Sequence, residues 1–441
     1  MVAREGLEAE QMGEPVVPGG IRRQVRGLRA SAVAAAVLSV AACGSSGSSG
    51  SPSGTAASTK PIILGAILPM TGNFGVIGQE VAAGLHVAVD QLNAKGGVMN
   101  RRVDLVIEDD QSTAAKAATA TSLLLDQEHA DIVEVSPIAT EALASLPITT
   151  QRKVITFTQS GTPTFGDVSK YPYNFMYSIP FQVQALAVAY EAQQLGAKRI
   201  GLLALADTSG KAAIGAVQDE ITKNTSLGMQ VVDSEGFDSQ AQDVTGLVAK
   251  LKDAKPDLLI LQTPANALGV ALRAVQQLGW KDIRILATNG TVTGDISKLI
   301  PDTVTSQFQA LTVKVLARSK PDALDPQYDA FAKQAVRYMS TIPSLQASLF
   351  ASDIANIVAW SVAKAGSTTP DKVRTALEGI SKASIPGLFA YTNPDYSAAH
   401  HDPQAADFSQ FWALITPSTP LYGTFVGSVV NIPALRANLQ S

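Results

Sequence analysis

Short apolar runs alternate with longer amphipathic segments from residue 60 onward, and this alternation limits the possible folds more than any other feature of the chain. The first run, residues 62–68, contains no polar side chain, which is typical of a strand buried on both faces of a parallel sheet. Apolar residues then repeat at helical spacing from Val81 to Leu92, and Gly96-Gly97 ends that segment. This stretch therefore predicts a strand followed by a helix.

The same alternation continues through the middle of the chain. Further strands are expected over residues 103–107, 131–135, 154–158, 199–205, 229–232, 257–262 and 283–287. Helices are expected over residues 113–129, 183–195, 210–223, 243–253 and 266–278. Because strands that alternate with helices of ten or more residues form parallel sheets through right-handed crossovers, the sequence predicts an α/β fold.

The pattern also indicates where the chain is divided. A stretch rich in Tyr and Pro, residues 171–180, interrupts the alternation and marks a first domain boundary. Beyond residue 300, helices are expected over 325–339 and 346–365, and a looser, proline-rich segment begins at 386. A chain of 441 residues with 46% hydrophobic content is long enough for two domains, each with a sizeable core.

The N-terminal segment has the pattern of an export signal. Residues 21–29 carry four arginines and no acid, and residues 30–42 are uncharged and mostly apolar. This apolar stretch is too short to cross a bilayer core of about 30 Å, although a buried, alanine-rich helix is the alternative. It ends in Val-Ala-Ala-Cys43, which resembles the lipobox of bacterial lipoproteins. That resemblance implies lipidation of Cys43, removal of residues 1–42, and attachment to the extracytoplasmic face of the cell membrane.

Residues 43–59 are dominated by Gly and Ser and predict a flexible tether between the lipid anchor and the folded part. The rest of the composition excludes several protein classes. The net charge is −4 without a basic block, so no nucleic-acid partner is expected. One cysteine excludes a disulfide within the chain and any zinc or iron–sulfur site of the CxxC type.

Catalytic motifs are missing from the sequence as well. No GxxxxGK[ST], GxGxxG, GxSxG or HExxH pattern occurs, so we expect neither an enzyme nor a bound cofactor. The acidic run 108–110 and the polar run 400–402 each have residues that bind metals in other proteins. Solvated loops are the preferred interpretation of both, and no metal site is predicted.

Several motifs in order resemble those of leucine/isoleucine/valine-type substrate-binding proteins, which are type I periplasmic binding proteins of ABC importers. The similarity extends over about residues 60–425 and rests on stretches 63–72, 92–98, 109–110, 136–140, 198–201, 255–257, 278–280 and 386–389, with Gly78 and Gly84. It implies two doubly wound parallel-sheet lobes joined by a three-strand hinge near Tyr177–Phe181. A small-molecule ligand would be enclosed between the lobes.

The resemblance also implies how the chain is shared between the lobes and what it works with. Lobe 1 would comprise residues 60–180 and 306–385, and lobe 2 residues 181–305. Residues 386–441 would form the hinge return and a C-terminal segment. The implied partners are an ABC permease with its ATPase subunits, and the protein itself is expected to be a monomer. A ligand-sensing receptor on the same fold is the alternative.

Candidate ligand-binding residues follow the expected strands of lobe 1. Ser136, Thr140, Ser160 and Thr162 offer hydroxyl groups for a carboxylate or another acceptor, although helix capping would explain each of them equally well. The glycine-rich stretch 72–78 would add Phe74 and Ile77. Its glycines either let the backbone approach a ligand closely or belong to a flexible loop.

Lobe 2 departs from the amino-acid-binding pattern. Asn289 stands where the resemblance places an acid for the ligand ammonium, and Ser209 and Ala265 stand where it places aromatic side chains. Asp207 is the nearest alternative acid. Because an amide cannot neutralise a buried ammonium, we expect a small neutral or anionic ligand instead of a branched-chain amino acid. An organic acid, an amide or an amino-acid-like solute would fit.

Overall fold

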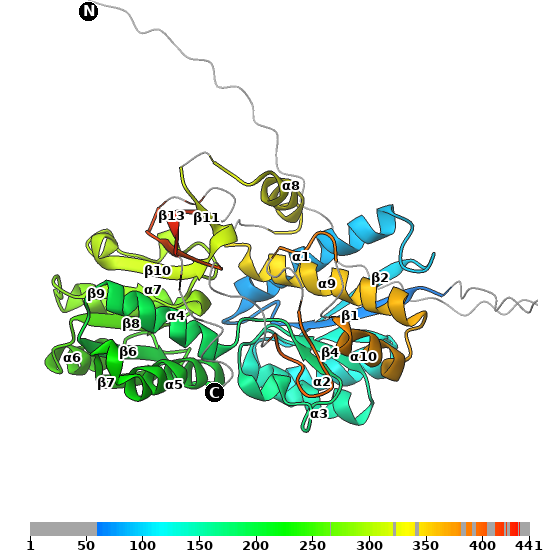
Figure 1. The fold of residues 1–441 in the computed structure, drawn as a ribbon, viewed down its shortest axis with the longest axis horizontal. Coiled ribbons are helices and arrows are strands. Elements are labelled where there is room, and N and C mark those ends of the chain that lie inside the picture. The colour runs from blue at the N-terminus through cyan, green and yellow to red at the C-terminus, as the bar shows by residue number, and fades with distance from the viewer. Residues whose placement is uncertain are drawn as a thin grey trace, which may run out of the picture. The chain divides into compact units, whose positions relative to one another are not determined.

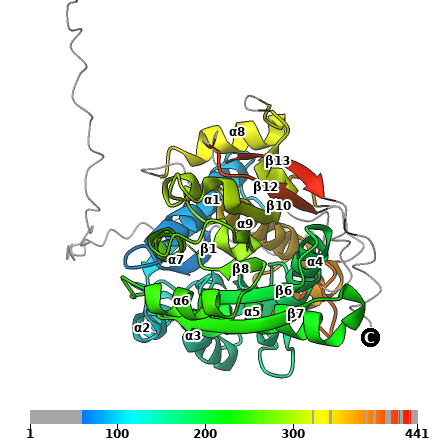
Figure 2. The same ribbon diagram turned by 90° about the vertical axis from the view of Figure 1, so that its left-hand side faces the viewer.

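The computed structural model describes residues 60–432, apart from 265, 321–322, 340–343, 381–384, 390–393, 404–410, 419, 421–423 and 431. The predicted signal peptide, Cys43, the tether and Ala265 lie outside the described residues. Two sheets organise the described part (Figures 1 and 2).

The first sheet has five parallel strands in the order β2-β1-β3-β4-β5. These strands are β1 Ile62–Leu68, β2 Val103–Asp109, β3 Ile132–Glu134, β4 Ile155–Thr158 and β5 Asn174–Met176. Leu64 on β1 lies opposite Leu105 on one side and Ile132 on the other. The central position of β1 explains why its sequence is continuously apolar.

Helices cover both faces of this sheet. They are α1 Gly75–Ala94, α2 Ala114–Asp126 and α3 Ala139–Gln151, joined later in the chain by α8 Pro326–Ala335, α9 Gln346–Ala365 and α10 Pro370–Glu378. From β1 the chain moves outward to β2 and then back past β1 to β3, so right-handed crossovers place α1 on one face and α2 and α3 on the other. Leu64 accordingly packs in the core that contains α1, and Ile67 packs with α2 and α3. Figure 1 shows α9 beside α1.

The second sheet has eight strands in the order β11-β13-β12-β10-β9-β8-β6-β7. They are β6 Arg199–Leu205, β7 Gln230–Phe237, β8 Leu258–Gln262, β9 Arg284–Ala287, β10 Phe308–Val313, β11 Ala317–Arg318, β12 Trp412–Ile415 and β13 Phe425–Val430. The strands from β6 to β10 are parallel to one another, and β12 is antiparallel to β10 and to β13. Figure 2 shows β12 between β13 and β10.

Four helices belong to the parallel part of this second sheet: α4 Phe181–Gln194, α5 Thr208–Lys223, α6 Thr245–Asp253 and α7 Asn266–Gln277. Here too the chain reverses direction, from β6 outward to β7 and then back to β8. The reversal places α5 on one face of the sheet and α6 and α7 on the other. Short 3₁₀ helices occupy Pro163–Gly166, Thr225–Leu227, Asn289–Thr291, Ile296–Lys298, Thr305–Gln307 and Lys314–Leu316. The expected fold class, two doubly wound α/β lobes, is confirmed.

The return to lobe 1, expected at residue 306, comes later in the structure. Strand β10 pairs with β9, and β11 pairs with β13, so residues 308–318 belong to the second sheet. Phe308 and Leu311 are buried there, and β10 pairs with the edge that β9 would otherwise expose. The segment after 386, expected as a hinge return, contributes β12 and β13 to the same sheet.

The chain passes from the first sheet to the second between β5 and α4, at residues 177–180. Tyr177 is fully buried at this crossing, and its hydroxyl donates to Asp353 Oδ2 on α9 at 2.7 Å. The same carboxylate accepts the backbone N–H of Phe389 at 2.8 Å. One buried acid therefore ties the crossing to α9 and to the segment that follows α10.

Candidate functional site

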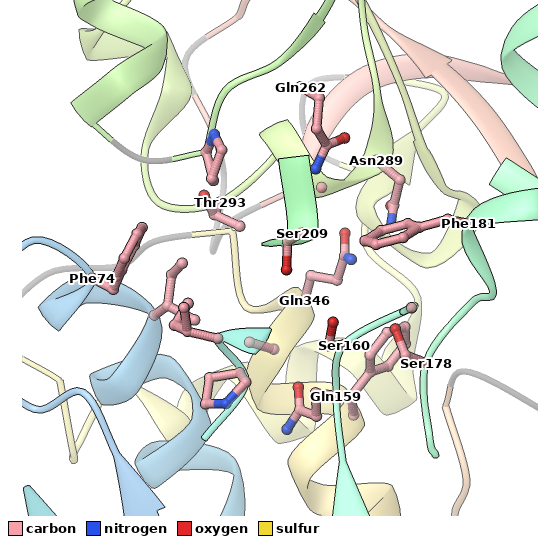
Figure 3. A pocket seen from close by; sticks show the side chains of 18 of the residues that line it. Phe74, Gln159, Ser160, Ser178, Phe181, Ser209, Gln262, Asn289, Thr293 and Gln346 are labelled. Carbon is pink, nitrogen blue, oxygen red and sulfur yellow. The ribbon is translucent and has the colours of Figure 1, made fainter. Parts of the chain in front are cut away.

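A cavity of about 130 Å³ lies where the carboxyl ends of strands from both sheets meet (Figure 3). Its walls come from the loops after β1, β3 and β4 in the first sheet and after β6, β8 and β9 in the second. The pairs β1/β3 and β6/β8 are the points where each strand order reverses, which is where ligands bind in open α/β sheets. The topology therefore places this cavity at the expected kind of site.

Polar and apolar residues share the lining. The polar ones are Gln159, Ser160, Ser178, Gln184, Asp207, Ser209, Gln262, Asn289, Thr293 and Gln346. The others are Phe74, Ile77, Pro137, Ile138, Gly161, Phe181, Pro264, Gly290, Ala347 and Phe350. In Figure 3, Gln262 and Asn289 lie above the cavity, and Gln159 and Ser160 lie below it.

Six of the nine residues singled out as ligand-binding from the sequence lie against this cavity: Phe74, Ile77, Ser160, Asp207, Ser209 and Asn289. Phe74 and Ile77 belong to the start of α1, which begins at Gly75. The glycines there allow a close approach of backbone to backbone, since a Cβ on Gly78 would lie 2.2 Å from the carbonyl oxygen of Pro69. Gly78 can therefore pack against Pro69 within the protein, a role that needs no ligand.

The other three candidates are not among the described residues that line the cavity. Ser136 is buried behind it, and its Oγ accepts the N–H of Ile138 at 3.5 Å. Thr140 is exposed, because α3 begins at Ala139 and turns this side chain outward. Thr162 lies 2.9 Å from Ser160, Oγ1 to Oγ, and so supports a lining residue without joining the lining.

Four glutamines of the lining were missed at the sequence level: Gln159, Gln184, Gln262 and Gln346. Gln262 ends β8, and Gln159 directly follows β4. Because both lie at the carboxyl ends of expected strands, the sequence could have identified them as candidate ligand-binding residues. Gln184 and Gln346 lie in the first turns of α4 and α9, and only the tertiary arrangement brings them to the cavity.

The lining is almost uncharged. Among the described residues that form it, Asp207 is the only acid, and there is no lysine, arginine or histidine. Asp207 caps α5, with its Oδ1 accepting the N–H of Gly210 at 2.7 Å. Burial raises the pKa of this carboxyl. A helix-capping role therefore accounts for Asp207 without any ligand.

A second acid faces the same region from lobe 1. Glu141 on α3 is buried, and its Oε2 has no hydrogen-bond partner in the described part of the chain. Burial raises the pKa of Glu141 to about 7, with the nearby charges of Asp110 and Asp207 adding to the rise. The electrostatic surroundings thus oppose a further negative charge between the lobes.

Hydrogen bonds fix one end of several carboxamides that line the cavity. Gln184 Nε2 donates to the carbonyl oxygen of Ile179 at 2.8 Å, and Gln159 Nε2 donates to Glu134 Oε1 at 2.5 Å. On the lobe 2 side, the hydroxyl of Thr288 donates to Gln262 Oε1.

Two polar contacts from α1 and the residues just before it reach lobe 2 near the cavity. Asn73, next to the lining residue Phe74, points its Nδ2 at Ser239 in the loop after β7, 3.4 Å from Oγ. Glu80 on α1 accepts the N–H of Gly294, beyond β9, at 3.0 Å. Glu80 is fully buried, and burial raises its pKa to about 7.

The runs considered as metal sites serve the fold instead. Asp110 Oδ1 accepts the N–H of Ser112 in the turn before α2. His401 does not lie in an open polar loop as expected, because it is buried and stacks on Phe175 with ring centres 3.9 Å apart. Within the described ranges, no three His, Cys, Asp or Glu side chains gather as metal ligands would, and no helix has the length and apolar character of a membrane span.

Comparison with known proteins agrees with this architecture. The family described as periplasmic binding protein matches residues 61–410. A Leu/Ile/Val-binding protein homolog of Brucella melitensis is 26% identical over 247 residues, which cover 54% of this chain and 61% of that protein. The chain spans about three fifths of the length of the curated relatives it matches.

Two solved structures share the fold. A solute-binding protein of an ABC transporter from R. palustris, in complex with 4-hydroxybenzoate, superposes with a TM-score of 0.68 at 18% identity, covering 84% of this chain and 96% of that one. The branched-chain amino acid transporter substrate-binding protein of Streptococcus pneumoniae, in complex with isoleucine, gives a TM-score of 0.67 at 18% identity, covering 84% and 100%. These two structures of the same fold therefore hold chemically different ligands.

Proposed function

Because the chain belongs to the periplasmic binding protein family, we propose that it captures a small polar solute between its two lobes and delivers it to an ABC permease with ATPase subunits. The observation that carries the proposal is the cavity at the carboxyl ends of both sheets, with a lining that mixes polar and apolar residues and is almost uncharged. We expect the ligand to be a small organic acid, an amide or an amino-acid-like solute. Neutral solutes fit best, because the described lining offers no cationic side chain to an anion.

A thermal-shift screen of the purified protein tests the proposal. Solutes from the three classes should be compared with sugars, since a ligand that binds only the folded state raises its stability by mass action. At about 100 times the dissociation constant, the gain is about 2.7 kcal/mol. If no small solute of any class raises the melting temperature, the proposed function is wrong.

A variant that fills the cavity supplies the control. Ser209→Trp places a bulky side chain in a lining position that is only half-buried, so the fold should tolerate it. The ligand-induced shift should disappear in this variant. Ser226→Trp, at an exposed position away from the cavity, should retain the shift in full.

We also propose that the protein is held on the extracytoplasmic face of the cell membrane through lipid on Cys43. The support is the sequence around Cys43, together with the extracytoplasmic location that the family implies. Cys43→Ser should leave the protein uncleaved or released from the membrane. Membrane fractionation and fatty-acid labelling check this, and a variant that still labels and still sediments with membranes would contradict it.

A further inference from the structure

Two glutamines of the cavity have their amide nitrogens held by groups outside it. For Gln184 the partner is the backbone carbonyl of Ile179, 2.8 Å away. A carbonyl can only accept a hydrogen bond, so this contact settles which end of the amide is the nitrogen. The other end, Gln184 Oε1, is buried and has no partner in the described part of the chain. It is an acceptor that a bound ligand can satisfy.

Gln159 is oriented in the same sense by Glu134. The carboxyl group of Glu134 is completely buried at the end of β3, and its Oε1 lies 2.5 Å from Gln159 Nε2. Figure 3 shows the amide oxygen of Gln159 turned toward the centre of the cavity and the nitrogen turned away. Burial raises the pKa of Glu134 to about 8, but a carboxyl group keeps an acceptor oxygen in both of its forms. The contact with Gln159 therefore does not require a charged Glu134.

This arrangement places constraints on the ligand. The buried oxygen of Gln184 needs a hydrogen-bond donor, and the oxygen of Gln159, turned toward the cavity, can accept a second one. A ligand carboxylate would bring acceptor oxygens against them, and no cationic side chain of the described lining would offset the repulsion. An ammonium would supply donors, but the one acid of that lining, Asp207, already caps α5. An uncharged NH₂ group satisfies both oxygens without a counter-ion.

We propose that the cavity selects uncharged solutes that carry an NH₂ group, of the carboxamide or urea type, and that Glu134 is the positioning residue that turns the Gln159 oxygen toward them. This inference rests on the proposed function, since it names the ligand class of the same cavity. Donors for the ligand's own carbonyl oxygen are available on the opposite wall. Gln262 accepts from Thr288 through its oxygen, which leaves its amide nitrogen available.

Matched pairs of ligands provide the first test. The members of each pair share a carbon skeleton and differ only in whether the carbonyl carbon carries NH₂ or O⁻. The pairs are acetamide and acetate, isobutyramide and isobutyrate, and benzamide and benzoate. Titration calorimetry of the purified protein, with urea as a further probe, should show each amide bound at least about tenfold more tightly than its acid, because an unsatisfied buried polar group is costly. Equal or tighter binding of the acids would overturn the inference.

Variants then test the two glutamines separately. Gln184→Leu removes the unpartnered oxygen and should weaken amide binding about tenfold. Gln182→Leu, at an exposed position on the same helix, is the matched control and should bind normally. If Gln184→Leu binds amides as tightly as the unmodified protein, Gln184 does not receive the ligand's donor.

The positioning role of Glu134 is tested by the ratio of amide affinity to acid affinity, and not by the affinity for either solute alone. Glu134→Met removes the acceptor that holds Gln159 Nε2, so the amide can turn over and the amide-to-acid preference should fall at least about fivefold. Glu134→Gln keeps an acceptor oxygen and should retain the preference. Gln159→Leu, which removes the oxygen itself, replaces Glu134→Met if that variant does not fold.

An unchanged preference in Glu134→Met or Gln159→Leu would refute the positioning role. The results also separate the two proposals. Solutes that bind with a preference for acids refute only the ligand class. Failure of every solute in the screen to bind would refute the proposed function, and the ligand class with it.

Discussion

At the scale of single residues, buried carboxyl groups without cationic partners determine how the protein should respond to pH. Glu80, Glu134 and Glu141 are all buried, and burial raises their pKa values to about 7, 8 and 7 from an ordinary 4.5. None of the three forms an ion pair within the described ranges. In the native state each therefore holds a proton that the unfolded chain releases at lower pH.

The sign of the resulting pH dependence follows from linkage. Through these three groups the native state binds more protons than the unfolded state between about pH 4.5 and pH 8, so their contribution to the free energy of unfolding should fall as pH rises through this window. Each fully shifted group contributes up to about 1.4 kcal/mol per pH unit. Denaturant titrations at pH 5, 6.5 and 8.5 measure the trend, and Glu134→Gln should flatten it and be the more stable protein at pH 8.5. Stability that increases over this range would contradict the prediction.

Charge balance at Asn289 and Asp207 leads to a prediction about the family's better-known ligands. Leucine, isoleucine and valine carry an ammonium group that Asn289 cannot neutralise, and Asp207 is engaged with the N–H of Gly210. A buried charge without a partner costs several kcal/mol, or about a hundredfold or more in affinity. Calorimetry should therefore show weak binding or none. Sub-micromolar binding that is lost in Asp207→Asn and kept in Asn289→Ala would identify Asp207 as the ammonium site.

At the scale of elements, helices α1 and α9 approach each other unusually closely through Gly84. A Cβ on Gly84 would lie 2.0 Å from the carbonyl oxygen of Ser348, and Ser348 Oγ also donates to the Glu80 carbonyl at 2.6 Å. Backbone of α9 therefore fills the space that a side chain at residue 84 would need. This pair of helices covers one face of the first sheet, and both helices begin beside the cavity.

Two glycine substitutions in helices should therefore have opposite effects. Gly84→Ala should lower stability by about 1–3 kcal/mol, because the added methyl group forces the two helices apart. Gly215→Ala, inside α5 with nothing within 4 Å of the added Cβ, should raise it by about 1 kcal/mol. Melting temperatures of the two variants provide the comparison. A neutral Gly84→Ala would mean that the helices can separate at little cost.

The elements differ in how well their sequences predicted them. Strand β6 and helix α9 occupy the expected ranges 199–205 and 346–365, because β6 is an uninterrupted apolar run after Arg199 and α9 is a long, mostly apolar segment. Helix α3 was not expected, since Pro147 lies inside it. Strands β12 and β13 were missed because β12 pairs with β10 and β13 pairs with β11, each about a hundred residues earlier, and such distant pairing leaves no local signal.

The cavity was predictable to the extent that strand ends position it. Ser160 and Asn289 follow expected strands and lie in the lining, whereas Thr140 follows one and faces solvent because of where α3 begins. Gln184 and Gln346 depend on how α4 and α9 pack, which periodicity does not reveal. Sequence reasoning thus located the loops of the site but not the helix residues that complete it.

At the scale of the whole molecule, the contact between Asn73 and Ser239 joins the two lobes beside the cavity. If ligand release requires the lobes to part, removal of this contact should raise the dissociation rate. Asn73→Ala and Ser239→Ala should each increase the rate about two- to fivefold, the effect expected of one hydrogen bond that is partly open to water. Stopped-flow displacement of the tightest-binding solute measures it.

A double-mutant cycle separates this contact from other effects of the two substitutions. The double variant should release ligand no faster than Asn73→Ala, because that substitution alone already removes the contacts of Nδ2 with both the hydroxyl and the carbonyl oxygen of Ser239. Ser226→Ala, away from the cavity, is the control and should not alter the rate. Strictly multiplicative effects in the double variant would show that Asn73 and Ser239 act independently.

The scarcity of charge in the cavity lining has a consequence for the speed of capture. An uncharged solute feels no long-range attraction toward the cleft, so its encounter with the protein depends on diffusion alone. Dissolved ions can screen only charges that attract or repel, and here there is almost nothing for them to screen. The association rate constant for an uncharged solute should therefore be nearly the same at low and at high ionic strength.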